Sequence, residues 1–162
     1  MTNNDVLKSI RYIFNFSDTD MIDIFKLADL TVSRELVCQW LKKDDDNSFK
    51  KCLDIELGTF LNGLINKNRG KKEGAQVPAD KRINNNIILR KLKIAMDLKS
   101  DGVVELLDLA DFKISNHELS AFFRKPDHKN FRTCKSQVLR NFLKGLRLKH
   151  RPGELKNNEL KW

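Results

Sequence analysis

Residues 60–64 of this chain read Phe60-Leu61-Asn62-Gly63-Leu64, and the pattern returns 82 residues later as Phe142-Leu143-Lys144-Gly145-Leu146. The same shift aligns residues 3–65 with residues 85–147 without a gap. Further identical pairs are Asn3/Asn85, Asn4/Asn86, Leu7/Leu89, Leu27/Leu109, Ala28/Ala110, Asp29/Asp111, Ser33/Ser115, Lys43/Lys125, Asp45/Asp127, Phe49/Phe131, Cys52/Cys134 and Leu57/Leu139. Self-similarity of this length indicates a duplicated unit at the lower end of domain size.

Each unit contains apolar residues at helical spacing, such as Val6, Leu7, Ile10 and Ile13. The pattern predicts an all-α protein, a tandem duplication of a four-helix unit. Residues expected to cap the helix starts are Asn4 and Asn86, Ser17, Ser33 and Ser115, and Asp54 and Ser136, with a second-helix start near Ser100.

Gly63 and Gly145 lie inside the pattern of the last helix of each unit. A glycine there costs about 1 kcal/mol relative to alanine. Its recurrence suggests that another helix approaches closely at this point, while the alternative is a helix that ends one turn early.

The net charge of +9 is unevenly distributed. The first unit, residues 1–65, carries −3, and a basic linker, residues 66–83, carries +4. The second unit, residues 84–150, carries +7, and the tail, residues 151–162, carries +1. The glycines of the linker predict mobility, and we expect a flexible tail.

The composition, 40% hydrophobic and 33% charged, is that of a globular protein. No apolar run approaches the roughly 18 residues that span a bilayer, and no secretory signal is recognisable.

Three cysteines cannot all pair, so we expect reduced thiols and a cytoplasmic location. We read the equivalent Cys52 and Cys134, and also Cys38, as buried packing residues, and we read nearly all of the aromatic residues as core.

Evidence for an enzyme is mostly negative, because the chain lacks a phosphate-binding glycine loop, a G-x-S-x-G elbow and an H-E-x-x-H motif. None of the three histidines lies at metal-ligand spacing, and Asp44-Asp45-Asp46 lacks the spacing of a calcium loop. We therefore expect no metal, no cofactor and no small-molecule substrate. An enzyme built around His128, with Asp127 and Arg132, remains open as a weaker hypothesis.

Two segments resemble a helix-turn-helix, residues 27–41 and residues 109–123. In each, a short turn and a serine cap precede a second helix with one apolar face. The turn glycine is replaced by Thr31 and Lys113, and the face that would read bases is only partly basic. Any pair of helices joined by a turn shows this pattern, so we favour the structural interpretation.

Basic residues cluster after residue 65 and could attract a phosphate backbone. Arg140, Lys144 and Arg147 are spaced to share one helix face. The candidate residues for binding DNA or RNA are Arg69, Lys71, Lys72, Arg90, Lys91, Lys93, Lys129, Arg132, Arg140, Lys144 and Arg147. The alternative is a protein-interaction or homo-oligomerisation module, in which the acidic first unit attracts the basic second unit.

The motifs resemble those of the bacterial YehS-like family, domain of unknown function 1456, which is usually present twice in a chain. The stretches that carry the resemblance are Asn3-Asn4-Asp5, Trp40-Leu41-Lys42-Lys43-Asp44-Asp45, Arg82-Ile83-Asn84-Asn85-Asn86 and Pro126-Asp127-His128-Lys129-Asn130-Phe131-Arg132. The resemblance covers roughly residues 3–147 and departs from the family pattern at Lys135-Ser136. It implies a small cytoplasmic bacterial protein and transfers no activity, substrate or catalytic residue.

Overall fold

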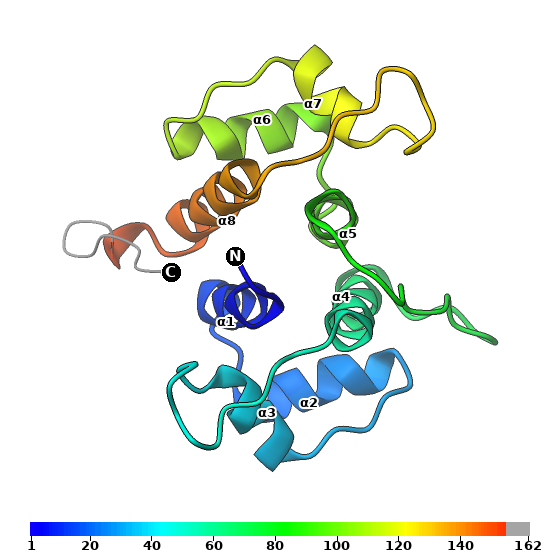
Figure 1. Cartoon of the computed structure of the whole chain (residues 1–162), viewed down its shortest axis with the longest axis vertical. Helices are drawn as coiled ribbons and strands as arrows, with labels where there is room; N and C mark the ends of the chain where they lie inside the picture. The colour runs from blue at the N-terminus through cyan, green and yellow to red at the C-terminus, as the bar shows by residue number, and fades with distance from the viewer. Residues whose placement is uncertain (155–162) are drawn as a thin grey trace. The chain divides into compact units, whose positions relative to one another are not determined.

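The computed structural model describes residues 1–154, and all regular structure in that range is helical (Figure 1). The chain divides into two compact units, residues 1–83 and the part that begins at Asn84. The first unit contains α1 (Asn3–Phe14), α2 (Asp18–Leu27), α3 (Arg34–Leu41) and α4 (Asp54–Arg69). The second contains α5 (Asn85–Ala95), α6 (Ser100–Leu109), α7 (Asn116–Phe122) and α8 (Ser136–His150), followed by the 3-10 turn η1 (Pro152–Glu154). The all-α fold with four helices per unit is confirmed.

Serine side chains start three of these helices as expected. Ser17, Ser33 and Ser115 each accept a hydrogen bond from the backbone N–H three residues later, which satisfies one of the unpaired donors of the first turn. The predicted cap role of Asp54 and Ser136 is wrong, because these residues are the first of α4 and α8. The cap residues before them, Leu53 and Lys135, provide no side-chain acceptor for the first turn.

The predicted cap role of Asn4 and Asn86 is also wrong. α1 and α5 start two residues earlier than expected and are capped by Thr2 and Asn84. Both asparagines therefore lie within the first turn, where they are buried.

Asn4 joins three distant parts of the first unit. Its Nδ2 donates to the carbonyl oxygens of Trp40 and Lys50, each at 2.9 Å, and its Oδ1 accepts from the backbone N–H of Cys52 at 3.0 Å. The start of α1 is thus tied to the end of α3 and to the loop that enters α4. We call these three bonds the amide clamp.

Asn86 makes the same clamp in the second unit. Its Nδ2 donates to the carbonyl oxygens of Phe122 and Arg132, at 3.1 and 2.9 Å, and its Oδ1 accepts from the N–H of Cys134 at 2.9 Å. The repeat therefore preserves a buried polar network as well as an apolar pattern.

The glycine in the last helix of each unit marks a close helix crossing. A Cβ atom placed on Gly63 would overlap the carbonyl oxygen of Ile24 in α2, and one on Gly145 would overlap that of Leu106 in α6. The close approach is confirmed. The alternative of an early helix end is wrong, because α4 and α8 continue well beyond these residues.

The apolar cores lie inside these crossings. In the first unit the ring of Phe25 lies 5.2 Å from those of both Trp40 and Phe60, and all three side chains are fully buried. In the second unit Phe142 is fully buried, whereas Phe122, the counterpart of Trp40, is half-buried. Most of the predicted core aromatics therefore contribute to packing.

The segment between the units differs from the mobile linker that its composition suggests. Residues 66–69 belong to α4, and the following residues return along that helix. The amide N–H of Ile83 donates to the carboxylate of Asp54 at 3.1 Å, at the opposite end of α4. Of the predicted tail, Arg151 follows α8 and residues 152–154 form η1, while residues 155–162 lie outside the described part.

We predict that Asn86→Ala lowers the free energy of unfolding by about 3 kcal/mol, because it leaves an N–H and two carbonyls of the clamp without a partner. Urea denaturation followed by circular dichroism measures the change. Asn116→Ala is the matched control, since the exposed amide of Asn116 makes one bond, to Asp101, and should change stability by less than about 0.5 kcal/mol. Equal losses for both variants would contradict the role of the clamp.

We also predict that Gly145→Ala destabilises the second unit by at least about 3 kcal/mol, because the added methyl meets the backbone of α6 and the two helices must separate. In Gly102→Ala the new methyl meets only the flexible side chain of Leu98, so this variant should be neutral or mildly stabilising. Thermal unfolding of the two variants gives the comparison, and a tolerated Gly145→Ala would show that the crossing is loose.

Candidate nucleic-acid interface

One side of α5 faces the loop between α7 and α8. Asn86 binds two carbonyls of this loop region, and the Nζ of Lys93 lies 4.8 Å from the ring centroid of Phe123 at the loop's beginning. Arg90 lies four residues after Asn86 and three before Lys93, so the helical repeat places it on the same side. Arg90 is exposed and Lys93 half-exposed.

The loop adds two exposed cations to this side. The backbone of Arg132 is fixed at both ends, because its N–H donates to the carbonyl of Ala121 at 3.1 Å and its own carbonyl accepts from Asn86. Its guanidinium reaches the carbonyl of Phe131 at 2.9 Å, and Lys129 is exposed nearby in the chain. We define Arg90, Lys93, Lys129 and Arg132 as the α5–loop surface.

Two further lysines lie in the same loop. Lys125 and Lys135 are exposed, and in the sequence they lie on either side of Lys129 and Arg132. Lys135 belongs to the basic cluster that the sequence indicates after residue 65, whereas Lys125 was not predicted, although it lies in the same short basic segment.

A second group lies on α8. Arg140, Lys144 and Arg147 belong to one continuous helix, so their spacing of four and three residues places them along one face as predicted. Arg140 is exposed and the other two are half-buried. Burial lowers the pKa of Arg147, with a smaller effect from the positive charge of Arg151.

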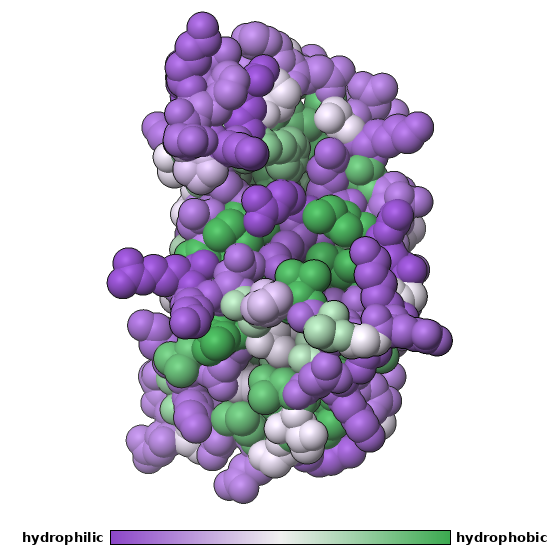
Figure 2. Space-filling view, turned by 90° about the vertical axis from the view of Figure 1, so that its right-hand side faces the viewer, coloured by the Kyte–Doolittle hydropathy of each residue, from purple (hydrophilic) through white to green (hydrophobic). Residues whose placement is uncertain are grey.

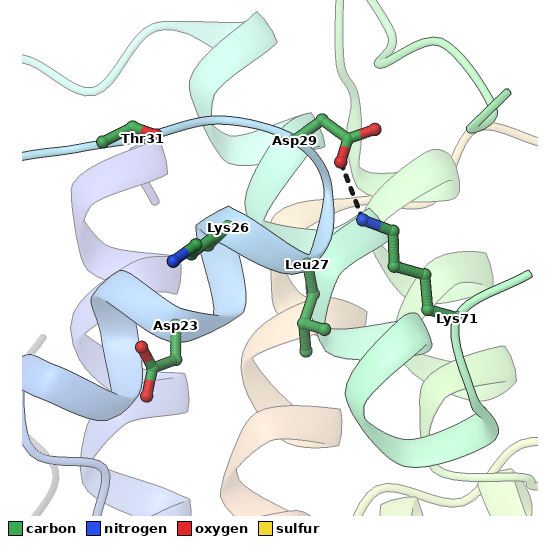
Figure 3. Close-up of a pocket in the computed structure, with 6 residues that line it drawn as sticks. All are labelled: Asp23, Lys26, Leu27, Asp29, Thr31 and Lys71. Carbon is green, nitrogen blue, oxygen red and sulfur yellow. Dashed lines mark hydrogen bonds and ion pairs between the residues drawn. The ribbon is translucent and has the colours of Figure 1, made fainter. Parts of the chain in front are cut away.

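Three candidates belong to the other unit. Arg69 is the last residue of α4, and Lys71 and Lys72 follow it, all exposed. The Nζ of Lys71 lies 2.7 Å from the carboxylate of Asp29. Figure 3 draws this ion pair as a dashed line. The linker charge is therefore partly neutralised by the unit to which it is attached.

Lys71 also borders an open pocket of about 630 Å³. The residues that line it are Asp23, Lys26, Leu27, Asp29, Thr31 and Lys71, drawn in Figure 3. Two carboxylates and two ammonium groups give this wall no net charge, so the pocket favours neither an anion nor a cation.

Lys91 differs from the other candidates because it is buried, with 8% of its surface exposed. It lies on α5 next to the apolar positions Ile88, Leu92 and Ala95, and that neighbourhood was a sequence signal for burial. A residue with so little exposed surface contributes little to contact with a phosphate backbone, so we leave Lys91 out of the candidate interface.

The helix pairs α2–α3 and α6–α7, which contain the helix-turn-helix-like segments, are acidic, unlike the rest of the second unit. Residues 100–122, which form α6 and α7, hold five acidic residues against one basic residue. The corresponding residues 18–41 of the first unit hold five acidic against two basic. The left-handed residue of each turn is an aspartate, Asp29 or Asp111, and not the residue at position 31 or 113. A net negative charge does not favour contact with a phosphate backbone.

His128 serves the local geometry of its loop. It is exposed, and its Nδ1 accepts a hydrogen bond from the N–H of Asn130 at 3.0 Å. Asp46, the equivalent residue of the first unit, accepts the same kind of bond from Ser48 at 2.8 Å. The hydrogen bond that His128 accepts stabilises the turn, and this role explains the residue without a catalytic function.

The thiols divide into two kinds. Cys52 and Cys134 are buried as predicted, and burial raises the pKa of each thiol to about 12. Cys38 is half-buried, less than predicted, and its Sγ lies 3.8 Å from the carboxylate of Asp18. None of the three is paired in a disulfide.

Figure 2 shows one face of the chain, on which hydrophilic side chains predominate and apolar ones lie in smaller groups between them. Within residues 1–154 there is no group of three or more His, Cys, Asp or Glu residues that could hold a metal ion. No helix in that range is long and apolar enough to cross a membrane.

Comparison with known proteins gives a family without an assigned function. The sequence profile described as "Protein of unknown function (DUF1456)" matches twice, at residues 3–70 and 85–152. The chain is 46% identical over 147 residues to "Uncharacterized protein YehS" of Escherichia coli (strain K12), which covers 90% of this chain and 94% of that protein. No solved structure matches.

We predict that a thiol reagent such as Ellman's reagent labels one cysteine, Cys38, in the native protein at pH 8, because thiols with a pKa near 12 stay protonated and enclosed. All three should react in denaturant. The Cys38→Ser variant should show no fast labelling, and rapid native labelling of that variant would contradict the burial of Cys52 and Cys134.

Proposed function

The chain belongs to the DUF1456 family, whose function is unknown, and we propose that it is a non-enzymatic protein that binds nucleic acid through a basic surface of its second unit. The observation that carries the proposal is the α5–loop surface, where four accessible cations come from two segments held together by the amide clamp of Asn86. A fixed backbone presents these cations without the entropy loss of ordering a loop on binding.

Charge separation within the second unit supports the same proposal. The acidic residues gather on α6 and α7, while residues 84–99 and 123–150 together carry +11. A unit polarised in this way attracts a polyanion to one set of elements and repels it from another, which orients the encounter.

The rival proposal, attraction between an acidic first unit and a basic second unit, receives less support. The linker packs on the first unit, so residues 1–83 together carry +1, whereas residues 84–162 carry +8. Two units of the same sign do not attract each other by net charge.

The expected mode of binding is contact with the phosphate backbone. Neither short helix that would enter a major groove is basic, because α3 carries one arginine and one glutamate and α7 carries one glutamate. The α5–loop surface offers ammonium groups of lysine and guanidinium groups of arginine. Such contacts give affinity with little sequence preference and a strong dependence on salt. Three unpaired thiols agree with a cytoplasmic location for this activity.

We predict that a fluorescent DNA duplex binds the full chain with an affinity that falls as salt rises, with a slope of roughly −3 to −4 in log K against log salt if all four cations contact phosphates. Arg90→Glu combined with Arg132→Glu should weaken binding more than about tenfold and reduce the slope by about 2. Fluorescence anisotropy across a salt series measures both quantities, and single-stranded RNA of equal length is tested in parallel.

The chain supplies its own control. Lys8 and Lys50 are the equivalents of Arg90 and Arg132 in the first unit, so Lys8→Glu combined with Lys50→Glu makes the same change of charge on the same scaffold. This pair should change the affinity by less than about threefold. Absence of any salt-sensitive binding by the native chain, or equal losses for the two pairs, would overturn the proposal.

A further inference from the structure

The first unit covers one face of α4 with its own chain. From the end of α4 the backbone turns back and runs antiparallel to the helix. Asn66 donates to the side-chain oxygen of Gln76 at 3.1 Å, and Asn62 donates to the carbonyl of Val77 at 3.4 Å. We call residues 76–83 the strap.

The strap follows the helix to its first turn. A Cβ atom on Gly58 would lie 3.2 Å from the carbonyl oxygen of Asp80, so the absence of a side chain there lets the strap approach the helix. The carboxylate of Asp54 then accepts from the N–H of Ile83. The strap meets four residues of α4 that follow one another at intervals of four: Asp54, Gly58, Asn62 and Asn66. At this interval they form one stripe along the helix.

The repeat identifies the counterpart of this stripe on α8. Its residues are Ser136, Arg140, Lys144 and Leu148. The equivalents of Gly58 and Asn62 are Arg140 and Lys144, so this stripe carries two positively charged hydrogen-bond donors. Arg140 is exposed, and Lys144 is half-exposed. We call this set the α8 stripe.

We propose that the α8 stripe binds an extended acidic segment of a partner protein, in the way that α4 holds the strap. The amide of Asn62 suits a backbone carbonyl, whereas Arg140 and Lys144 suit carboxylates. Leu148, half-buried at the end of the stripe, suits an apolar side chain of a peptide and offers nothing to a phosphate backbone.

Helix and strand geometry sets the spacing of the acidic residues. Arg140 and Lys144 are separated by about 6 Å along the helix axis, from a rise of about 1.5 Å per residue. Side chains two residues apart on an extended chain point to the same side and are separated by about 6.6 Å. The segment therefore carries Asp or Glu at alternate positions.

The test uses the full chain and fluorescent synthetic peptides as long as the strap. The first peptide has two glutamates at alternate positions, and the second has the same composition with the glutamates adjacent. We expect the first to bind several-fold more tightly by anisotropy at low salt. Arg140→Glu combined with Lys144→Glu should weaken its binding roughly tenfold or more.

The matched control is Arg90→Glu combined with Arg132→Glu, which changes the charge equally on the α5–loop surface and should leave peptide binding within about threefold. Equal binding of the two peptides, or equal losses for the two pairs of variants, would overturn the proposal. Loss of duplex DNA binding in the α8 variant with no peptide binding by the native chain would assign the stripe to nucleic acid. A native dimer that the α8 variant abolishes in sedimentation would assign it to a second copy.

Discussion

The buried amide of Asn4, repeated by Asn86, is the interaction on which each unit depends. Apolar burial supplies most of the driving force for folding, but it is non-directional and does not fix how one segment lies against another. The three hydrogen bonds of each amide clamp are directional, and they join segments between 36 and 48 residues apart. They set the path of the chain into α4 and α8, and those helices then cross α2 and α6 at a glycine.

The sequence predicts the elements of the fold better than their connections. Apolar spacing identifies four helices in each unit, and the recurring glycine suggests a close crossing because a glycine inside a helix is costly. The structure was needed to exclude an early helix end. The prediction that Asn4 and Asn86 are helix caps is wrong for a physical reason. Asparagine is a frequent helix cap, and a local pattern contains no information about carbonyl groups that lie far away in the chain. A shift of two residues in the helix start changes the amide from an exposed cap to a buried clamp.

The candidate site shows a similar division. The count of charges along the chain predicts that the second unit is basic, and the helical repeat places Arg140, Lys144 and Arg147 on one face. Which charges are accessible depends on packing. Lys91 is buried beside apolar positions, and Lys71 bonds to an aspartate of its own unit. The amide clamp brings α5 close to the loop before α8. The spacing of basic residues in the sequence does not predict this contact.

The two units also separate what the scaffold requires from what it permits. The clamp asparagines and the crossing glycines are identical in both, and so are many core residues, because each has a defined partner that tolerates no other side chain. The exposed positions of the same helices are under no such constraint, and there the units differ in charge. On α4 the stripe is occupied by the chain's own strap, so its side chains are suited to a backbone. On α8 the same positions carry cations. The charge of the second unit is therefore a property of the positions that folding leaves free, and those are the positions at which a partner can be recognised.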